Sequence, residues 1–209
     1  MQVICQPVGP VEANCYIVLE NNKALVIDPG ADAPTLIGMI QALNADVQGV
    51  LLTHAHFDHM GAVDDLIKEF KVDVYMNPAE FDFLSEPSKN SSSAFFGMPH
   101  VSLKAKPLPL KQGEQKIGDF EVTAYSAPGH SIGSTILKIQ DCLFTGDVLF
   151  NQSIGRTDLA TGSREQMKES LDFLKNLPGN YEVYPGHGPS TTLDQERKNN
   201  PYLIFPNMI

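Results

Sequence analysis

Short runs of apolar and β-branched residues open the chain and predict strands. These runs are residues 3–4, 15–19 and 24–28. Asn21 and Asn22 between the second and third runs predict a hairpin turn. Helices and strands are then predicted to alternate. Apolar residues at helical spacing predict helices at 34–43 and 61–70, and apolar runs predict strands at 47–53 and 72–76. The first half is therefore predicted to form strands followed by alternating helices and strands.

The second half repeats this plan with strands first and a helix afterwards. The expected strands are 115–117, 120–125, 134–139, 142–145 and 181–184, and the expected helix is 163–177. No linker rich in Gly, Ser or charge separates the halves. We therefore expect one α/β domain over residues 1–209, with two sheets packed on each other and helices outside.

Residues 85–106 interrupt the pattern with turn formers around a few aromatic side chains. We expect a mobile loop near an active site. His100 lies in this loop without a neighbouring strand end, and we assign it no role. Four phenylalanines lie in or near this loop: Phe81, Phe83, Phe95 and Phe96. We expect them to pack against the rest of the protein and not to line a substrate site.

Charge and cysteine content narrow the classes of function. The 15 Lys and Arg against 25 Asp and Glu give a net charge of −10, which disfavours binding to nucleic acid or to anionic lipid. Three widely spaced cysteines suit a reducing compartment better than a disulfide framework. The first residues lack a basic leader, and no run approaches the roughly 18 apolar residues of a membrane span. We expect a cytoplasmic protein that does not act on nucleic acid or membranes.

Three histidines and one aspartate fall within six residues, directly after a predicted strand. They are His54, His56, Asp58 and His59. In a chain that leaves a strand end, the first two can project to one side while the others turn toward a neighbouring point. Imidazole and carboxylate ligands favour zinc, manganese or ferrous iron, and the lack of cysteine argues against a closed structural zinc site.

Further ligand candidates each follow a predicted strand and a glycine. They are His130 in Pro-Gly-His, Asp147 in Thr-Gly-Asp and His187 in Pro-Gly-His. A sharp turn at such a glycine places the next side chain at the end of its strand, and several strand ends can meet at one edge. Asp28 in Asp-Pro-Gly is either a turn residue or a hydrogen-bond partner of a metal-binding histidine, and the sequence leaves both open.

These motifs, in this order, resemble the metallo-β-lactamase superfamily. Within it, the segments that most resemble glyoxalase II-like (hydroxyacylglutathione hydrolase-like) enzymes are 14–18, 127–134, 145–150 and 155–158. The resemblance implies an αββα sandwich of two mixed sheets that binds two metals. It implies that His54, His56 and His130 bind the first metal, that Asp58, His59 and His187 bind the second, and that Asp147 bridges them. By the same resemblance Arg156 aligns with a basic substrate contact that binds a carboxylate, and the sequence leaves open a solvated loop residue instead.

Two divalent metals, with zinc preferred over iron or manganese, can lower the pKa of a shared water to about 7 and so supply hydroxide. Asp58 can accept a hydrogen bond from that hydroxide and orient it. The pKa of a thiol is about 8.5, so a thiolate leaves without protonation. A thioester therefore suits a site that supplies hydroxide but no proton donor for the leaving group. The resemblance points to a small-molecule thioester of the S-2-hydroxyacylglutathione type, such as S-D-lactoylglutathione.

The sequence also departs from the family pattern. Only about twenty residues follow His187, so the helical region that contacts glutathione in longer glyoxalase II enzymes is missing, and the thiol is left open. Family β-lactamases usually have cysteine where this chain has Asp147 and are exported, which disfavours antibiotic hydrolysis. The alternatives are a mononuclear-iron persulfide dioxygenase-like oxygenase, a phosphodiesterase of the same superfamily, and an inactive metal-binding scaffold.

Overall fold

The computed structural model describes residues 1–94 and 99–209, and the chain divides into two compact units. The first unit consists of Met1–Leu110 with Lys116–Phe120, and the second of Lys111–Gln115 with Glu121–Ile209. The expectation of a single domain over residues 1–209 stays a prediction.

The first sheet has six strands in the order β1-β2-β3-β4-β5-β6. Their bounds are β1 Gln2–Val8, β2 Ala13–Glu20, β3 Lys23–Ile27, β4 Asp46–Leu51, β5 Val74–Met76 and β6 Leu108–Pro109. The first three strands pair antiparallel, whereas β3 to β6 pair parallel, so the sheet is mixed. The predicted hairpin turn is confirmed, because Asn21 and Asn22 both adopt positive φ, at 51° and 61°.

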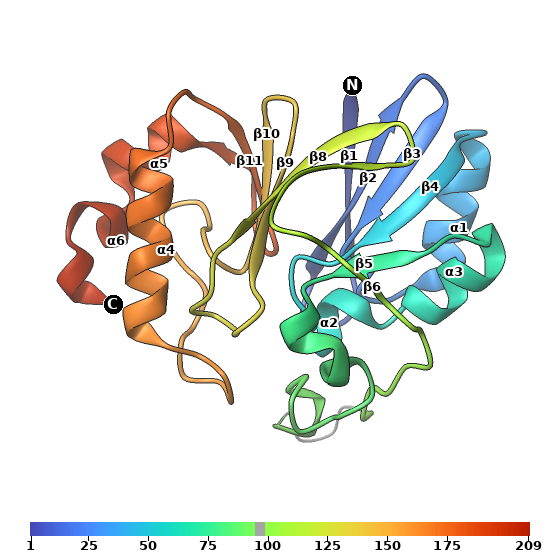
Figure 1. Ribbon diagram of the computed structural model, residues 1–209, viewed down its shortest axis with the longest axis horizontal. Helices are drawn as coiled ribbons and strands as arrows, with labels where there is room; N and C mark the ends of the chain where they lie inside the picture. The colour runs from blue at the N-terminus through green and yellow to red at the C-terminus, as the bar shows by residue number, and fades with distance from the viewer. Residues whose placement is uncertain (95–98) are drawn as a thin grey trace. The chain divides into compact units, whose positions relative to one another are not determined.

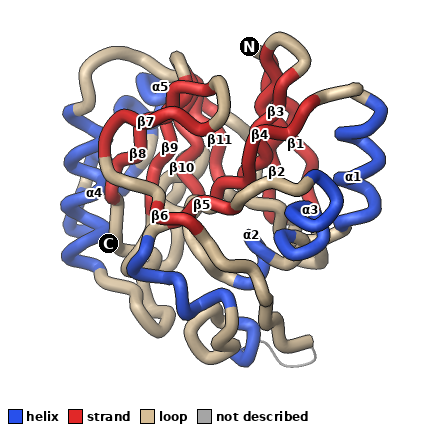
Figure 2. Tube along the Cα trace, turned by 45° about the vertical axis from the view of Figure 1, so that its right-hand side comes forward, coloured by secondary structure: helices blue, strands red, loops and turns tan. Residues whose placement is uncertain are grey.

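Helices α1 (Ala33–Ala42) and α3 (Val63–Phe70) lie side by side along one face of this sheet (Figures 1 and 2). Apolar residues at helical spacing are buried on both helices, among them Leu36, Ile40 and Leu66, and they share one core with Ile17 and Val50 of the strands. This packing fixes the strand ends from which the candidate ligands depart.

Three shorter helices complete the first unit, and they are α2 (Phe57–Met60), η1 (Pro78–Leu84) and η2 (Ser92–Ala94). Phe83 is buried and Phe81 packs partly buried against the core, as expected. The other two members of the aromatic group, Phe95 and Phe96, lie outside the described residues, as does the part of the expected loop at 95–98.

The second sheet also has six strands, in the order β12-β11-β10-β9-β8-β7. Their bounds are β7 Gly113–Ile117, β8 Phe120–Ser126, β9 Thr135–Ile139, β10 Cys142–Gly146, β11 Glu182–Pro185 and β12 Thr191–Thr192. This sheet is mixed as well, because β10 pairs parallel with β11 and antiparallel with β9.

Helix α4 (Arg164–Asn176) flanks the second sheet, with α5 (Leu193–Asn199), α6 (Pro201–Ile204) and the turn η3 (Pro206–Met208) beside it (Figure 1). Met167, Leu171 and Leu174 bury the apolar face of α4 in a core with strand residues. The predicted start is confirmed, since the Ser163 hydroxyl accepts a hydrogen bond from the Gln166 amide. Among the helices of the described residues, none is both long and apolar enough to cross a membrane.

Candidate metal centre

The first ligand set lies just beyond the end of β4, where the chain runs extended before α2 begins. His54 and His56 are in the extended part, whereas Asp58 and His59 lie in the short helix α2, which the sequence did not predict. The rings converge: the ring centroids of His54 and His56 are 4.8 Å apart, and those of His54 and His59 are 4.2 Å apart. One segment thus brings three buried imidazoles together.

Asp28 supports this segment from the end of β3, in a left-handed conformation with φ of 50°. Its Oδ1 accepts a hydrogen bond from the Thr53 amide at 2.7 Å, and its Oδ2 accepts one from the Thr53 hydroxyl at 2.6 Å. The same Oδ2 lies 3.1 Å from His59 Nδ1. The hydrogen bond to a histidine of the motif is therefore found. A carboxylate on Nδ1 presents Nε2 as the ligand nitrogen, which is common behind metal-binding histidines.

The carboxylate oxygen of Asp58 and the ring nitrogen of His59 are spaced as two ligands of one ion would be. Asp58 Oδ2 lies 3.7 Å from His59 Nε2, and ligand atoms of Asp28, His54 and His59 all lie within 4.8 Å of one another. Two atoms each about 2.1 Å from a tetrahedral ion are about 3.4 Å apart. Because both Asp28 oxygens bind Thr53, we assign Asp28 to orientation and Asp58 to ligation.

Glu80 is a supporting residue that sequence reasoning missed. It lies in η1, is 0% exposed, and its Oε2 accepts a hydrogen bond from the Ala55 amide at 2.7 Å. Ala55 is the residue between His54 and His56, so this buried carboxylate fixes the backbone that carries both imidazoles. No motif marks Glu80, because the contact joins residues 25 positions apart.

The backbone of the Asp-Pro-Gly turn, residues 28–30, lies close to the backbone of α2. A Cβ added to Gly30 would lie 1.6 Å from the Asp58 carbonyl oxygen, and one added to Gly61 would lie 2.3 Å from the Gly30 carbonyl oxygen. The Ala62 amide donates to the Pro29 carbonyl oxygen at 2.9 Å. The Asp-Pro-Gly turn therefore packs directly against α2, and only glycine fits at position 30.

The second ligand set comes from the second unit, and its members follow different strands. Asp147 comes directly after β10, His187 follows β11, and His130 follows β8 through a short turn. Asp147 Oδ2 lies 3.4 Å from His130 Nε2 and 3.7 Å from His187 Nε2. One carboxylate oxygen thus faces two imidazole nitrogens at distances suited to shared metal coordination.

A backbone carbonyl supports this second set. His130 Nδ1 lies 2.8 Å from the Arg156 carbonyl oxygen, which presents Nε2 toward Asp147. Gly155 makes the approach possible, because a Cβ there would lie 1.9 Å from the Asp147 carbonyl oxygen and 3.1 Å from His130 Nδ1. The Gly-Arg-Thr-Asp segment therefore positions two candidate ligands through its backbone.

The Arg156 side chain is exposed and binds Asp158 through two hydrogen bonds of 2.6 and 2.8 Å. This guanidinium lowers the pKa of the Asp158 carboxyl to about 2. His100 is exposed as well, and nothing in the described part of the chain gives it a role.

The two buried thiols, Cys15 and Cys142, are not activated as nucleophiles. None of the three cysteines is in a disulfide. Burial raises the pKa of the Cys15 thiol well above its usual range and that of Cys142 to about 11, so both are protonated at neutral pH. The donor sets of the two units, made of histidine nitrogens and aspartate oxygens, fit divalent zinc, iron or manganese.

The matched family model spans both ligand sets. The model of the metallo-β-lactamase superfamily matches residues 8–187, a range that includes both sets and the segments between them. The chain belongs to this superfamily. The predicted α/β fold of two mixed sheets flanked by helices is confirmed as the metallo-β-lactamase fold.

Two curated relatives cover nearly the whole chain. The "Probable metallo-hydrolase YqgX" of Bacillus subtilis (strain 168) is 37% identical over 94% of this chain and 95% of its own length. The "Hydroxyacylglutathione hydrolase GloC" of Haemophilus influenzae (strain ATCC 51907 / DSM 11121 / KW20 / Rd) is 34% identical over 97% of this chain and 98% of its own length. These similarities indicate an enzyme of the metallo-hydrolase type.

Two solved structures are also similar over the full length. The BLEG-1 B3 metallo-β-lactamase has a TM-score of 0.92 and 39% identity, and covers 97% of this chain and 99% of its own. TTHA1623, crystallised in a di-iron-bound form, has a TM-score of 0.84 and 33% identity, and covers 96% of this chain and all of its own.

Proposed function

We propose that the two ligand sets form one dinuclear metal centre that hydrolyses a thioester of the S-2-hydroxyacylglutathione type. In this assignment His54, His56 and His130 bind one metal, and Asp58, His59 and His187 bind the other. Asp147 would be shared by the two metals. The observation that supports the proposal is the Asp147 oxygen 3.4 Å and 3.7 Å from two imidazole nitrogens, a spacing that fits metal ligands.

Two bound divalent metals would polarise the substrate carbonyl and lower the pKa of a water molecule to about 7. Zinc is our first choice because it suits histidine and aspartate ligands, with iron or manganese as alternatives. The di-iron form of TTHA1623, at 33% identity, supports a centre with two ions and keeps iron in consideration.

The protein's own groups orient the reaction. Asp58, which lies in α2, would accept a hydrogen bond from the attacking water and direct its lone pair to the carbonyl carbon. The Asp28 carboxylate and the Arg156 carbonyl oxygen lie against Nδ1 of His59 and His130, which holds each ring with Nε2 as the ligand atom.

A thioester is favoured as the substrate because its hydrolysis needs no proton donor for the leaving group. The leaving thiolate departs without a proton donor, because the pKa of a thiol is about 8.5. The 34% identity to the hydroxyacylglutathione hydrolase GloC supports this class. We further propose that Arg156 binds a carboxylate of the substrate, after exchanging its present partner Asp158.

We propose that the enzyme works in the cytoplasm on small molecules and not on nucleic acid or membranes. Three cysteines outside disulfides support a reducing compartment. The net charge of −10 supports a partner other than nucleic acid.

The test is a substrate panel on protein of known metal content. We expect S-D-lactoylglutathione to turn over faster than a lactone, a β-lactam or a phosphodiester. β-Lactam hydrolysis is the second candidate, because BLEG-1 is 39% identical. Turnover of the β-lactam alone would replace the proposed function with that one, and turnover of the phosphodiester alone would assign a phosphodiesterase.

The oxygenase alternative requires a separate assay. A glutathione persulfide assay with an oxygen electrode should show no oxygen uptake, and thioester hydrolysis should proceed equally under nitrogen. Oxygen consumption by protein that contains one iron would contradict the dinuclear hydrolase.

A further inference from the structure

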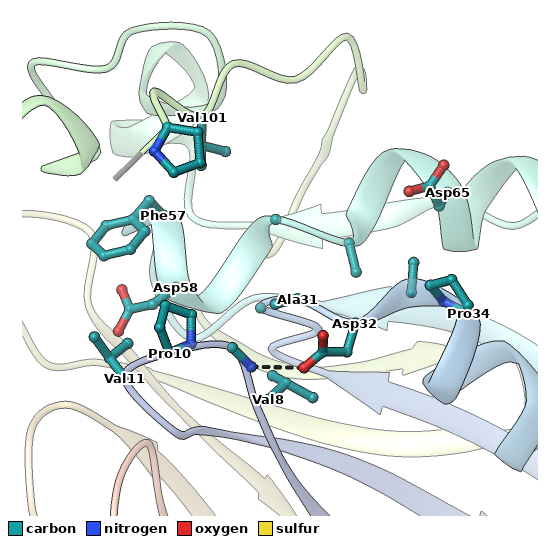
Figure 3. A pocket seen from close by; sticks show the side chains of 16 residues that line it. Val8, Pro10, Val11, Ala31, Asp32, Pro34, Phe57, Asp58, Asp65 and Val101 are labelled. Atoms are coloured by element: carbon teal, nitrogen blue, oxygen red, sulfur yellow. Dashed lines mark hydrogen bonds between the residues drawn. The ribbon is translucent and has the colours of Figure 1, made fainter. Parts of the chain in front are cut away.

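A pocket of about 380 Å³ lies within the first unit and opens beside Asp58 (Figure 3). This volume falls within the range of about 300–1,000 Å³ that is typical of small-molecule sites. Its walls come from the turn after β1, the start of α1, the helix α2 and residues 99–101. Of the candidate metal ligands, only Asp58 lines this pocket, and no substrate group has been assigned to it.

The pocket is lined mainly by apolar groups. The side chains are those of Val8, Pro10, Val11, Ala31, Ala33, Pro34, Phe57, Ala62, Pro99 and Val101. In Figure 3, Phe57 and Val11 lie on either side of Asp58 at one end, with Pro34 and Asp65 at the other. A substrate group that extends from the carbonyl near Asp58 would therefore meet apolar walls.

The charged groups of the lining are all acidic. They are Asp32, Asp58 and Asp65, and no lysine, arginine or histidine is among the lining residues that the structure describes. Asp32 Oδ2 accepts a hydrogen bond from the Gly9 amide at 2.8 Å, and Asp65 is exposed on α3. A carboxylate in this pocket would lose hydration without gaining a cationic side chain, and would face the carboxylates of Asp32 and Asp65.

We infer that this pocket binds the acyl group of the substrate, and that it selects acyl groups that are apolar and carry no negative charge. The inference rests on the proposed thioester hydrolase and specifies the acyl side of its substrate. Glutathione carries two carboxylates and fits the pocket poorly, which leaves the acyl group as the occupant. Acyl chains larger and more apolar than 2-hydroxypropanoyl are then better substrates.

Direct binding tests the pocket without any turnover. Protein with ¹³C-methyl valine is titrated with 2-phenylethanol and, separately, with 3-phenylpropanoate. We expect the alcohol to shift the methyl signals of Val8, Val11 and Val101, which line the pocket, at least tenfold more strongly than the anion does. The methyls of Val50 and Val74, in the core of the same unit, serve as internal references. Equal shifts with the anion, or no shifts with the alcohol, would overturn the inference.

A charge variant sharpens this result. Asp65→Lys adds a cation to the exposed rim of the pocket and should raise the affinity for 3-phenylpropanoate about tenfold. Asp172→Lys, exposed on α4, makes the same change in net charge without touching the lining and should leave binding unchanged. Equal effects of both variants would assign the change to net charge and contradict a local site.

Turnover then separates the acyl inference from the proposed function. Glutathione thioesters of propanoate, hexanoate and succinate are compared in the wild-type protein. We expect kcat/KM for hexanoyl to exceed that for propanoyl about tenfold, with succinyl lowest. A rank order with succinyl first would refute the pocket assignment and leave thioester hydrolysis intact. Absence of turnover for all thioesters, with the methyl shifts retained, would refute the proposed function and leave an apolar binding pocket.

Discussion

The two ligand sets are supported in different ways. In the first unit, four candidate ligands lie within six residues, and the buried carboxylates of Asp28 and Glu80 hold their segment. In the second unit, three candidate ligands follow separate strands, and the backbone carbonyl of Arg156 holds His130. The first set therefore depends on buried side chains in addition to the close approach of backbone at Gly30, whereas the second depends largely on the course of the backbone.

This difference predicts how each set tolerates change. Side-chain substitutions behind the first set should reduce metal affinity directly. Behind the second set, side-chain substitutions should matter little, whereas a change that moves the backbone should be severe. The following variants test this contrast in order of decreasing effect.

Asp58→Ala should cause the largest loss of activity. It removes both a candidate ligand and the acceptor for the attacking water, so kcat/KM for the thioester should fall about 10³-fold or more. The free energy of unfolding should change little, because the Asp58 side chain is not fully buried, with 15% of it exposed. Steady-state kinetics and chemical denaturation measure the two quantities. Wild-type kcat/KM in this variant would exclude Asp58 from the mechanism.

Added methyl groups at the two tight glycines should come next. Gly30→Ala and Gly155→Ala place a Cβ 1.6 and 1.9 Å from the carbonyl oxygens of Asp58 and Asp147. Each should destabilise the protein by about 3 kcal/mol, because backbone must move, and each should weaken metal binding. Gly38→Ala is the matched control, since an added Cβ there meets nothing within 4 Å, and it should stabilise α1 by up to about 1 kcal/mol.

Denaturation with urea gives these free energies. A Gly155→Ala protein as stable as Gly38→Ala, with full metal content, would show that the close approach of this backbone to Asp147 is not needed. The same outcome for Gly30→Ala alone would remove the role of the Asp-Pro-Gly turn behind the first set.

Substitution of the two carboxylates that support the first set should have intermediate effects. Asp28→Asn and Glu80→Gln keep the shape of each side chain but replace a charged acceptor with a weaker neutral one. We expect each to lower metal affinity or activity about 10- to 100-fold, as substitutions behind metal ligands commonly do. Competition with a chromophoric chelator measures the affinity, and an unchanged affinity in both variants would contradict the difference between the two sets.

Arg156→Ala should have the smallest effect. The carbonyl oxygen that contacts His130 remains, so metal affinity should equal that of the wild-type protein. Only the proposed contact with a substrate carboxylate is lost, and KM for S-D-lactoylglutathione should rise several-fold with little change in kcat. A fall in metal content would show that the side chain matters to the second set, and an unchanged KM would remove the substrate contact.

Local sequence patterns were sufficient to predict some of these features. Apolar periodicity predicted most strands and the helices α1, α3 and α4, because these segments bury one face in a core. The histidine-rich segment was evident because its members are adjacent. Asp28 was marked by the Asp-Pro-Gly turn, and the structure places it against His59 as well as in the turn.

Features that depend on tertiary contacts were not predictable. Glu80 meets Ala55 only after η1 folds back, and nothing local to either residue indicates it. The C-terminal helices were missed although they support the segment after Asp147. Glu196 there accepts a hydrogen bond from the Gln152 amide at 2.8 Å, and Asn200 donates to the Ser153 carbonyl oxygen at 3.0 Å. The grouping of all seven ligands in one centre stays a prediction.

Metal titration tests the central claim most directly. Metal-free protein is titrated with zinc, and in parallel with ferrous iron under nitrogen, while bound metal and thioester hydrolysis are measured on the same samples. The account predicts that binding saturates at two ions per chain and that full activity requires the second ion. Saturation at one ion per chain, with full activity at that point, would contradict a dinuclear centre formed by the two ligand sets.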